Sequence, residues 1–291
     1  MQSRRQFLGA GAAVAGLAIA GCTAGAGSGR AEAYAELTAG GSDRPAFVDG
    51  YRFKSLREAG FEDFETVDEV LGINPGNLAD TVVVTFATET PSQYWILQGS
   101  FERDTVESTF DHSRRVGQYG GFETFESEET EASADLFGIA DGTVVVATSR
   151  SRYEQAIDRV RGEIPSLTER DGEFGTLTRT VGSLDWVTVS IAETADEIPG
   201  DPVVTGRGAA VRPGKSEYRV VAVYPSHSIA AEHETAFRTE PVRDQETIWD
   251  HETAVDGRTV TLTAFVPTGA LGDAIPPRSG VRQQLLNRKV I

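Results

Sequence analysis

The stretch TVVVTFA, residues 81–87, decides the fold class, because it is short, apolar and rich in β-branched residues. Such side chains suit a pleated strand and lose rotamer freedom in a helix, so the stretch predicts a buried strand. Residues 93–100, QYWILQGS, predict a second strand close behind it. Further strands are expected along the chain at residues 122–127, 135–140, 143–148, 186–192, 205–212, 217–224, 246–254 and 258–266.

Turn residues separate several of these strands. Asp141-Gly142 and Asp256-Gly257 are strong hairpin signals, and Pro213-Gly214 also predicts a turn between two strands. Between the strands, apolar residues recur with helical spacing. The helices expected from that spacing cover residues 55–60, 66–71, 102–116, 151–161 and 228–239.

This order of elements predicts an α+β fold made of two loosely similar units, each an antiparallel sheet with helices on one face. Both halves run strand, helix, strand and then an Asp-Gly hairpin; the closest local match pairs ADGTVV with VDGRTV. The expected boundaries are a signal peptide at 1–21, a flexible tether at 22–46, a first unit at 47–165 and a second unit at 166–291.

The N-terminus has the pattern of an export signal. Arg4 and Arg5 are followed by Phe7 and Leu8, then by a Gly/Ala-rich apolar run that ends at Ala20, before Gly21-Cys22. That run is shorter than the roughly 20 residues a membrane-spanning helix needs, so it is expected to be a targeting segment rather than part of the fold. Cys22 is the only cysteine, which leaves no partner for an internal disulfide.

These residues resemble a twin-arginine signal joined to a lipobox, with small residues directly before the cysteine. The chain as a whole resembles haloarchaeal twin-arginine-exported lipoproteins of unknown function. The resemblance implies a lipid on Cys22, and a location at the cell surface, anchored to the outer face of the cytoplasmic membrane. Such families are uncharacterised and therefore imply no catalytic residues.

The negative charge of the chain indicates adaptation to concentrated salt rather than the charge of a substrate. The chain has a net charge of −17 and only three lysines, at positions 54, 215 and 289. A carboxylate-rich surface in which arginine replaces lysine is similar to halophilic adaptation, since near 1 M salt a Debye length of about 3 Å screens the self-repulsion. We therefore infer no cationic substrate from the acidity, and we expect neither a nucleic-acid partner nor a cofactor.

Familiar catalytic motifs are missing or fail on spacing. Residues 208–216, GAAVRPGKS, are similar to a phosphate-binding loop, but five residues separate the glycines and the segment joins two expected strands. The G-x-S-x-G elbow is absent. The weak metal candidates are His233, Asp250 and His251, which lie among carboxylates without tight ligand spacing.

Three tryptophans fall in expected strands, at positions 95, 186 and 249. Packing in the core is the more common role for such residues, and a carbohydrate platform is the alternative.

The leading hypothesis is therefore a non-catalytic surface lipoprotein that binds an unknown ligand or protein partner, or supports the envelope. A first alternative is an extracellular hydrolase or metal-dependent enzyme, which predicts perturbed titratable groups around His233, Asp250 and His251. A second alternative is an accessory subunit of a membrane complex, which predicts an exposed apolar patch.

Overall fold

The computed structural model describes residues 38, 45–58, 73–86, 92–108, 113–127, 136–182, 184–191, 200–239 and 250–270. The predicted helix at 66–71 and the predicted signal peptide lie outside the described residues. Within the described part, the turns at Asp141-Gly142, Pro213-Gly214 and Asp256-Gly257 each join two strands, as expected, and each turn glycine has a positive φ.

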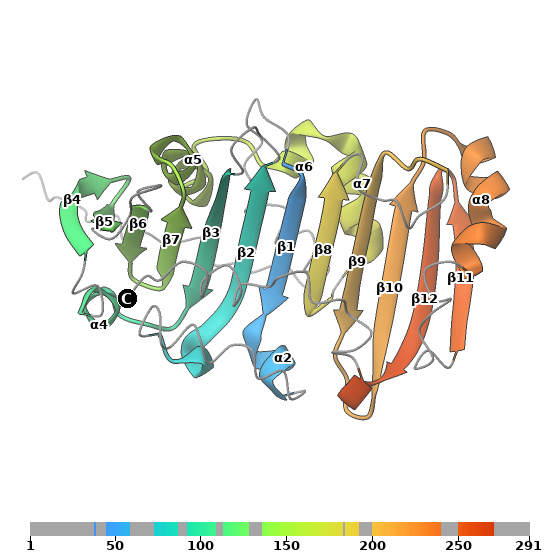
Figure 1. The fold of residues 1–291 in the computed structure, drawn as a ribbon, viewed down its shortest axis with the longest axis horizontal. Coiled ribbons are helices and arrows are strands. Elements are labelled where there is room, and N and C mark those ends of the chain that lie inside the picture. The colour runs from blue at the N-terminus through green and yellow to red at the C-terminus, as the bar shows by residue number, and fades with distance from the viewer. Residues whose placement is uncertain are drawn as a thin grey trace, which may run out of the picture.

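The described strands form one 12-stranded antiparallel sheet (Figure 1). Their order across the sheet is β11-β12-β10-β9-β8-β1-β2-β3-β7-β6-β5-β4. The strands are β1 (Phe47–Arg52), β2 (Leu78–Phe86), β3 (Ser92–Gly99), β4 (Ser113–Tyr119), β5 (Phe122–Ser127), β6 (Leu136–Ala140), β7 (Thr143–Ala147), β8 (Trp186–Ile191), β9 (Val204–Ala210), β10 (Lys215–Val223), β11 (Asp250–Asp256) and β12 (Thr259–Pro267).

Helices cover both faces of this sheet, which corrects the prediction of helices on one face. The first face carries α2 (Phe53–Glu58), α4 (Arg103–Glu107) and α8 (His227–Thr239), whose apolar side chains join one core cluster. The second face carries α5 (Arg150–Val160), α6 (Leu167–Arg170) and α7 (Gly172–Val181), which join the other. Because alternate strand residues point to opposite faces, a sheet buried on both sides needs two helical layers.

The two predicted units are not shown by the structure, because the sheet is continuous and each core cluster contains residues of both halves. β1 pairs with β2 on one side and with β8 on the other, and so joins the halves. The strand order β2-β3-β7-β6 nevertheless has the same form as β9-β10-β12-β11. In both, the segment between the two hairpins contains a helix and the last strand lies beside the second; in the first half this segment also contains β4 and β5.

The helix predicted for residues 102–116 is wrong in its second part, since β4 begins at Ser113 and, among the described residues of this stretch, only those of α4 are helical. A Gly-Gly turn accounts for the difference. Gly120 and Gly121 have φ values of 57° and 88°, which suit the tight hairpin that pairs β4 with β5.

Two helices between residues 161 and 186 were not predicted, although the sequence carries their caps. Ser166 and Glu169 form a capping box at the start of α6. Asp171 caps α7 by accepting hydrogen bonds from the backbone N–H groups of Glu173 and Phe174, each at 3.0 Å. The α7 residues Phe174, Leu177 and Val181 then pack into the core of the second face.

Thr38 lies within the stretch predicted to be a tether, yet it is buried in the folded domain. Its carbonyl accepts a hydrogen bond of 2.8 Å from the backbone N–H of Leu167, at the start of α6. The chain therefore contacts the domain before the expected boundary at residue 46. Figure 1 places this contact beside α6, at the end of the sheet opposite α2.

Candidate functional site

A buried carboxylate organises the end of the sheet at which β1 finishes. Asp185 directly precedes β8, and its backbone N–H donates to the carbonyl of Ala209 at 2.8 Å. Its own carbonyl accepts from the backbone N–H of Arg52, also at 2.8 Å. Both bonds extend the ladders of the sheet by one residue, so the side chain of Asp185 has a fixed position between β1 and β9.

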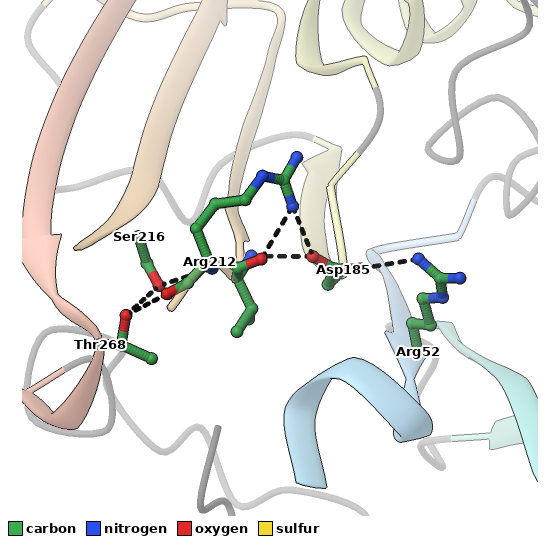
Figure 2. A network of polar contacts seen from close by, with 6 residues as sticks. Arg52, Asp185, Arg212, Ser216 and Thr268 are labelled. Atoms are coloured by element: carbon green, nitrogen blue, oxygen red, sulfur yellow. Dashed lines mark hydrogen bonds and ion pairs between the residues drawn. The ribbon is translucent and has the colours of Figure 1, made fainter. Parts of the chain in front are cut away.

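The Asp185 carboxylate contacts two arginines from distant parts of the chain (Figure 2). Oδ1 accepts a hydrogen bond from Nη1 of Arg52 at 3.3 Å, and Oδ2 accepts one from the backbone N–H of Val211 at 2.8 Å. Nη1 of Arg212 lies 3.7 Å from Oδ2. The side chain of Asp185 is 5% exposed, whereas those of Arg52 and Arg212 are 37% and 61% exposed. The anion is therefore buried and both cations reach solvent.

The turn between β9 and β10 is tied to the end of β12, which holds Arg212 in place. The backbone N–H of Arg212 donates to Oγ of Ser216 at 3.2 Å, and Ser216 Oγ lies 3.0 Å from Oγ1 of Thr268. The Thr268 hydroxyl donates in turn to the carbonyl of Arg212, and Nη1 of Arg212 donates to the carbonyl of Val211 at 2.8 Å. Figure 2 shows that these contacts fix the backbone from which the Arg212 side chain projects.

Further cations stand at the same end of the sheet. Lys54 and Arg57 lie on α2, which follows β1 directly, and both are exposed. Lys215 begins β10, and its ammonium lies 4.2 Å from the ring centroid of Phe265. We call this surface the cationic end; it comprises Arg52, Lys54, Arg57, Arg212 and Lys215.

The side chains of the cationic end are chemically suited to contact anions rather than to transfer protons. Guanidinium and ammonium groups carry positive charge and offer only hydrogen-bond donors. Such a surface suits carboxylate or phosphate oxygens, with arginine favouring bidentate contact. The segment RPGK, residues 212–215, supplies two of the five cations through a turn between two strands, and so it is not a phosphate-binding loop.

A second polar group lies on the first face, near the middle of the sheet. The hydroxyl of Thr188 donates to Oδ1 of Asp49 at 2.5 Å, between neighbouring positions of β1 and β8. Tyr51 lies two residues further along β1, and burial, followed by the nearby charge of Asp49, raises the pKa of its phenol well above the ordinary value. Tyr51 is therefore neutral at physiological pH, and the group fits a packing role.

The structure does not bring the weak metal candidates into one site. The ring of His233, on α8, stacks on Tyr224 with centroids 6.0 Å apart and planes 13° from parallel. Asp250 and His251 are exposed neighbours on β11 and point to opposite faces of the sheet. Among the described residues, no group of three or more His, Cys, Asp or Glu side chains is arranged to hold a metal ion.

Other residues singled out from the sequence divide between core and undescribed segments. Trp95 and Trp186 are buried in the core of the first face, as the packing interpretation expected, while Trp249 lies outside the described residues. The lipid-attachment and export residues Cys22, Arg4, Arg5, Phe7 and Leu8 also lie outside them. Sequence reasoning missed Asp185 because it looks like an ordinary residue before a strand, and missed Arg52 because no strand was predicted there.

Comparisons with known proteins show the fold alone. No family model and no curated protein sequence matches this chain. Crystal form I of TP0453, a Treponema membrane-associated lipoprotein, matches with a TM-score of 0.50 and 10% identity over 83% of this chain and 95% of that chain. Crystal form III matches with a TM-score of 0.49 and 11% identity over 83% and 96%. In the described part of this chain, no helix has the length and apolar character needed to cross a membrane.

Proposed function

We propose that this chain is an extracytoplasmic surface protein, held at the outer face of the cytoplasmic membrane by a lipid on Cys22. Its folded domain then acts as a non-catalytic binding or envelope-associated module. The observation that carries the proposal is the position of Cys22, the only cysteine, directly after an Arg-Arg pair and a short apolar run. A lone thiol at that position has a ready role as a lipid acceptor.

The fold supports this assignment without establishing it. The sheet resembles that of TP0453, which is itself a membrane-associated lipoprotein. The contact of Thr38 with α6 also shows where the segment that follows Cys22 first meets the domain, among the described residues. The two residues are sixteen positions apart, and a chain of that length spans at most about 53–58 Å. That length lets the domain stand clear of the lipid headgroups while it remains close to the surface.

The acidity fits a protein that works in concentrated salt. With a net charge of −17, the compact state repels itself at low ionic strength, and salt removes that penalty. We therefore expect the domain to be more stable near 1 M salt than in dilute buffer.

Neither alternative function is favoured by a specific observation. An enzyme built around His233, Asp250 and His251 requires these groups to converge, and His233 instead packs on Tyr224. An accessory subunit requires an exposed apolar patch, and among the described residues Val116 is the one large hydrophobic side chain recorded as exposed.

The test is the intact mass and membrane fractionation of the protein expressed in a halophilic host, compared with a Cys22→Ser variant. We expect the wild type to begin at Cys22, to carry a lipid mass and to enter the detergent phase. The variant should lack that mass and leave the membrane. A soluble wild-type protein, or a variant that fractionates in the same way, would contradict the proposal.

A further inference from the structure

The cationic end concentrates positive charge in an acidic chain. It contains two of the three lysines and three of the arginines, while the net charge of the whole chain is −17. The five residues come from two separate segments, 52–57 and 212–215, which the sheet brings to one end. Unlike the acidic surplus, which solubility explains, this local excess has no explanation in the proposed function.

The five cations of this end outnumber the carboxylates beside them, which are Asp185, the exposed Glu58 of α2 and Asp80, opposite Arg52 in the pairing of β1 with β2. Asp185 is one carboxylate and contacts two guanidinium groups, so the Arg52–Asp185–Arg212 group keeps a net positive charge. Elsewhere, Arg114 pairs with Glu126 and Arg161 with Glu163 one to one, while Arg103 contacts two carboxylates, those of Asp104 and Glu107. The carboxylate, which is 5% exposed, hydrogen-bonds Arg52 directly, while Nη1 of Arg212 lies 3.7 Å from it and donates to the Val211 carbonyl.

The orientation of the two arginines leaves donors for a ligand. Each turns Nη1 toward Asp185, and a guanidinium has five N–H donors, so each keeps further donors on its solvent side. Figure 2 shows the remaining guanidinium nitrogens directed away from Asp185. Two guanidinium groups held by one buried anion form a preorganised receptor for oxyanions, which lowers the entropy cost of binding.

We propose that the cationic end binds a carboxylate-rich polypeptide segment of a partner at the cell surface. The cations spread over α2 and the β9–β10 turn rather than converging on one point, which suits an extended chain of carboxylates. The anchored N-terminal segment meets the domain beside α6, at the opposite end of the sheet (Figure 1). A lipid surface is therefore the less suitable partner, an argument that rests on the proposed anchoring at Cys22.

High salt limits the range over which the charges of this site attract an anion. At about 1 M salt, charges more than roughly 3 Å from an anion no longer attract it appreciably. Binding must then come from direct hydrogen-bonded contact with the arginines, and fixed guanidinium groups are suited to that. We expect binding to weaken with salt but to persist where a diffuse electrostatic attraction would be lost.

The experiment measures binding of fluorescent polyglutamate to the detergent-solubilised full chain over a series of salt concentrations. Arg52→Gln/Arg212→Gln should weaken binding by about tenfold or more, on the scale of two charge-assisted contacts. The matched control, Arg114→Gln/Arg115→Gln, removes the same charge from the exposed strand β4 and should change binding by about twofold or less. Lys54→Gln/Arg57→Gln leaves the Asp185 contacts intact and should also weaken binding.

The Asp185→Asn variant tests whether binding depends on fixed arginine positions or on positive charge alone. It makes the cationic end more positive by one unit, so a purely electrostatic surface would bind polyglutamate more tightly. Loss of the fixed arginine positions predicts weaker binding instead. A circular dichroism spectrum like that of the wild type confirms that the variant is folded.

Three results overturn the proposal: no binding of polyglutamate, equal losses in the cationic-end and β4 variants, or tighter binding by Asp185→Asn. Vesicles of anionic lipid provide the competing partner. If they bind to the Cys22→Ser chain through Arg52 and Arg212 while polyglutamate does not, the ligand is a lipid headgroup and the polypeptide assignment is wrong. A Cys22→Ser chain that behaves like the wild type in fractionation contradicts the proposed function alone, since polyglutamate binding is measured without a membrane.

Discussion

Removal of the Asp185 carboxylate should destabilise the domain measurably. In Asp185→Ala, the N–H of Val211 loses an acceptor at 2.8 Å, and Arg52 loses one at 3.3 Å. Hydrogen bonds to charged groups are worth about 1.5–3 kcal/mol each. The two arginines reach solvent, at 37% and 61% exposure, and water will replace part of what they lose. We therefore expect a loss of about 2–4 kcal/mol in the free energy of unfolding, with most of it from the orphaned Val211 N–H.

The assay is chemical denaturation at high salt, followed by circular dichroism, with Glu232→Ala as the control. Glu232 is an exposed acidic residue on α8, so its removal makes the same change in net charge with an expected effect within about 0.5 kcal/mol. Asp185→Asn keeps an oxygen for the Val211 N–H and should cost less than Asp185→Ala. The reasoning is refuted if Asp185→Ala costs less than about 1 kcal/mol, or if Asp185→Asn costs as much.

Three further predictions concern other parts of the fold. Tyr153→Phe removes a buried hydroxyl that lies 2.7 Å from Oγ1 of Thr124, and thermal or denaturant unfolding should show a loss of about 1–2 kcal/mol; no loss would mean that Thr124 finds another partner. Gly120→Ala places a Cβ 2.5 Å from Ile157, whereas the Cβ of Gly162→Ala, also at positive φ, meets nothing within 4 Å. Gly120→Ala should therefore lower the free energy of unfolding by about 1–3 kcal/mol more than Gly162→Ala in the same assay. Equal losses in the two variants would exclude the clash. The hydrogen bond from Tyr119 to Asp158 raises the pKa of that phenol to about 12, so this contribution to stability is present below pH about 10 and is lost as the pH rises through about 12. Phenolate absorbance, taken as the difference from Tyr119→Phe, should titrate at lower pH in Asp158→Asn, and an unchanged midpoint would exclude Asp158 as the cause.

The strands predicted correctly from the sequence carry local signals. β2 and β12 are rich in β-branched residues, and the Asp256-Gly257 turn sets β11 as the hairpin partner of β12. These features act within a few residues, so a linear pattern is sufficient to find them. The same local signals explain why a phosphate-binding loop was correctly rejected, because the segment around Pro213-Gly214 has strand signals on both sides.

The central strand of the sheet was not predicted. β1 has the sequence FVDGYR, in which Asp49 and Gly50 both disfavour a strand. It becomes a strand because β2 and β8 lie on either side and satisfy its backbone groups along the whole length. Tertiary pairing between segments more than a hundred residues apart therefore overrides local propensity, and no window of sequence contains that information.

The cationic end was missed for a related reason. Arg52 and Asp185 are 133 positions apart, and their contact exists only because β1 and β8 are neighbours in the sheet. Counts of charge over the chain conceal it, since the net value of −17 reflects the acidic surplus. What distinguishes this end is the stoichiometry of its ion pairs, in which one buried carboxylate holds two exposed guanidinium groups. A balanced pair has no net charge left for a partner, whereas this unbalanced group keeps a positive charge. That property follows from the folded arrangement rather than from composition.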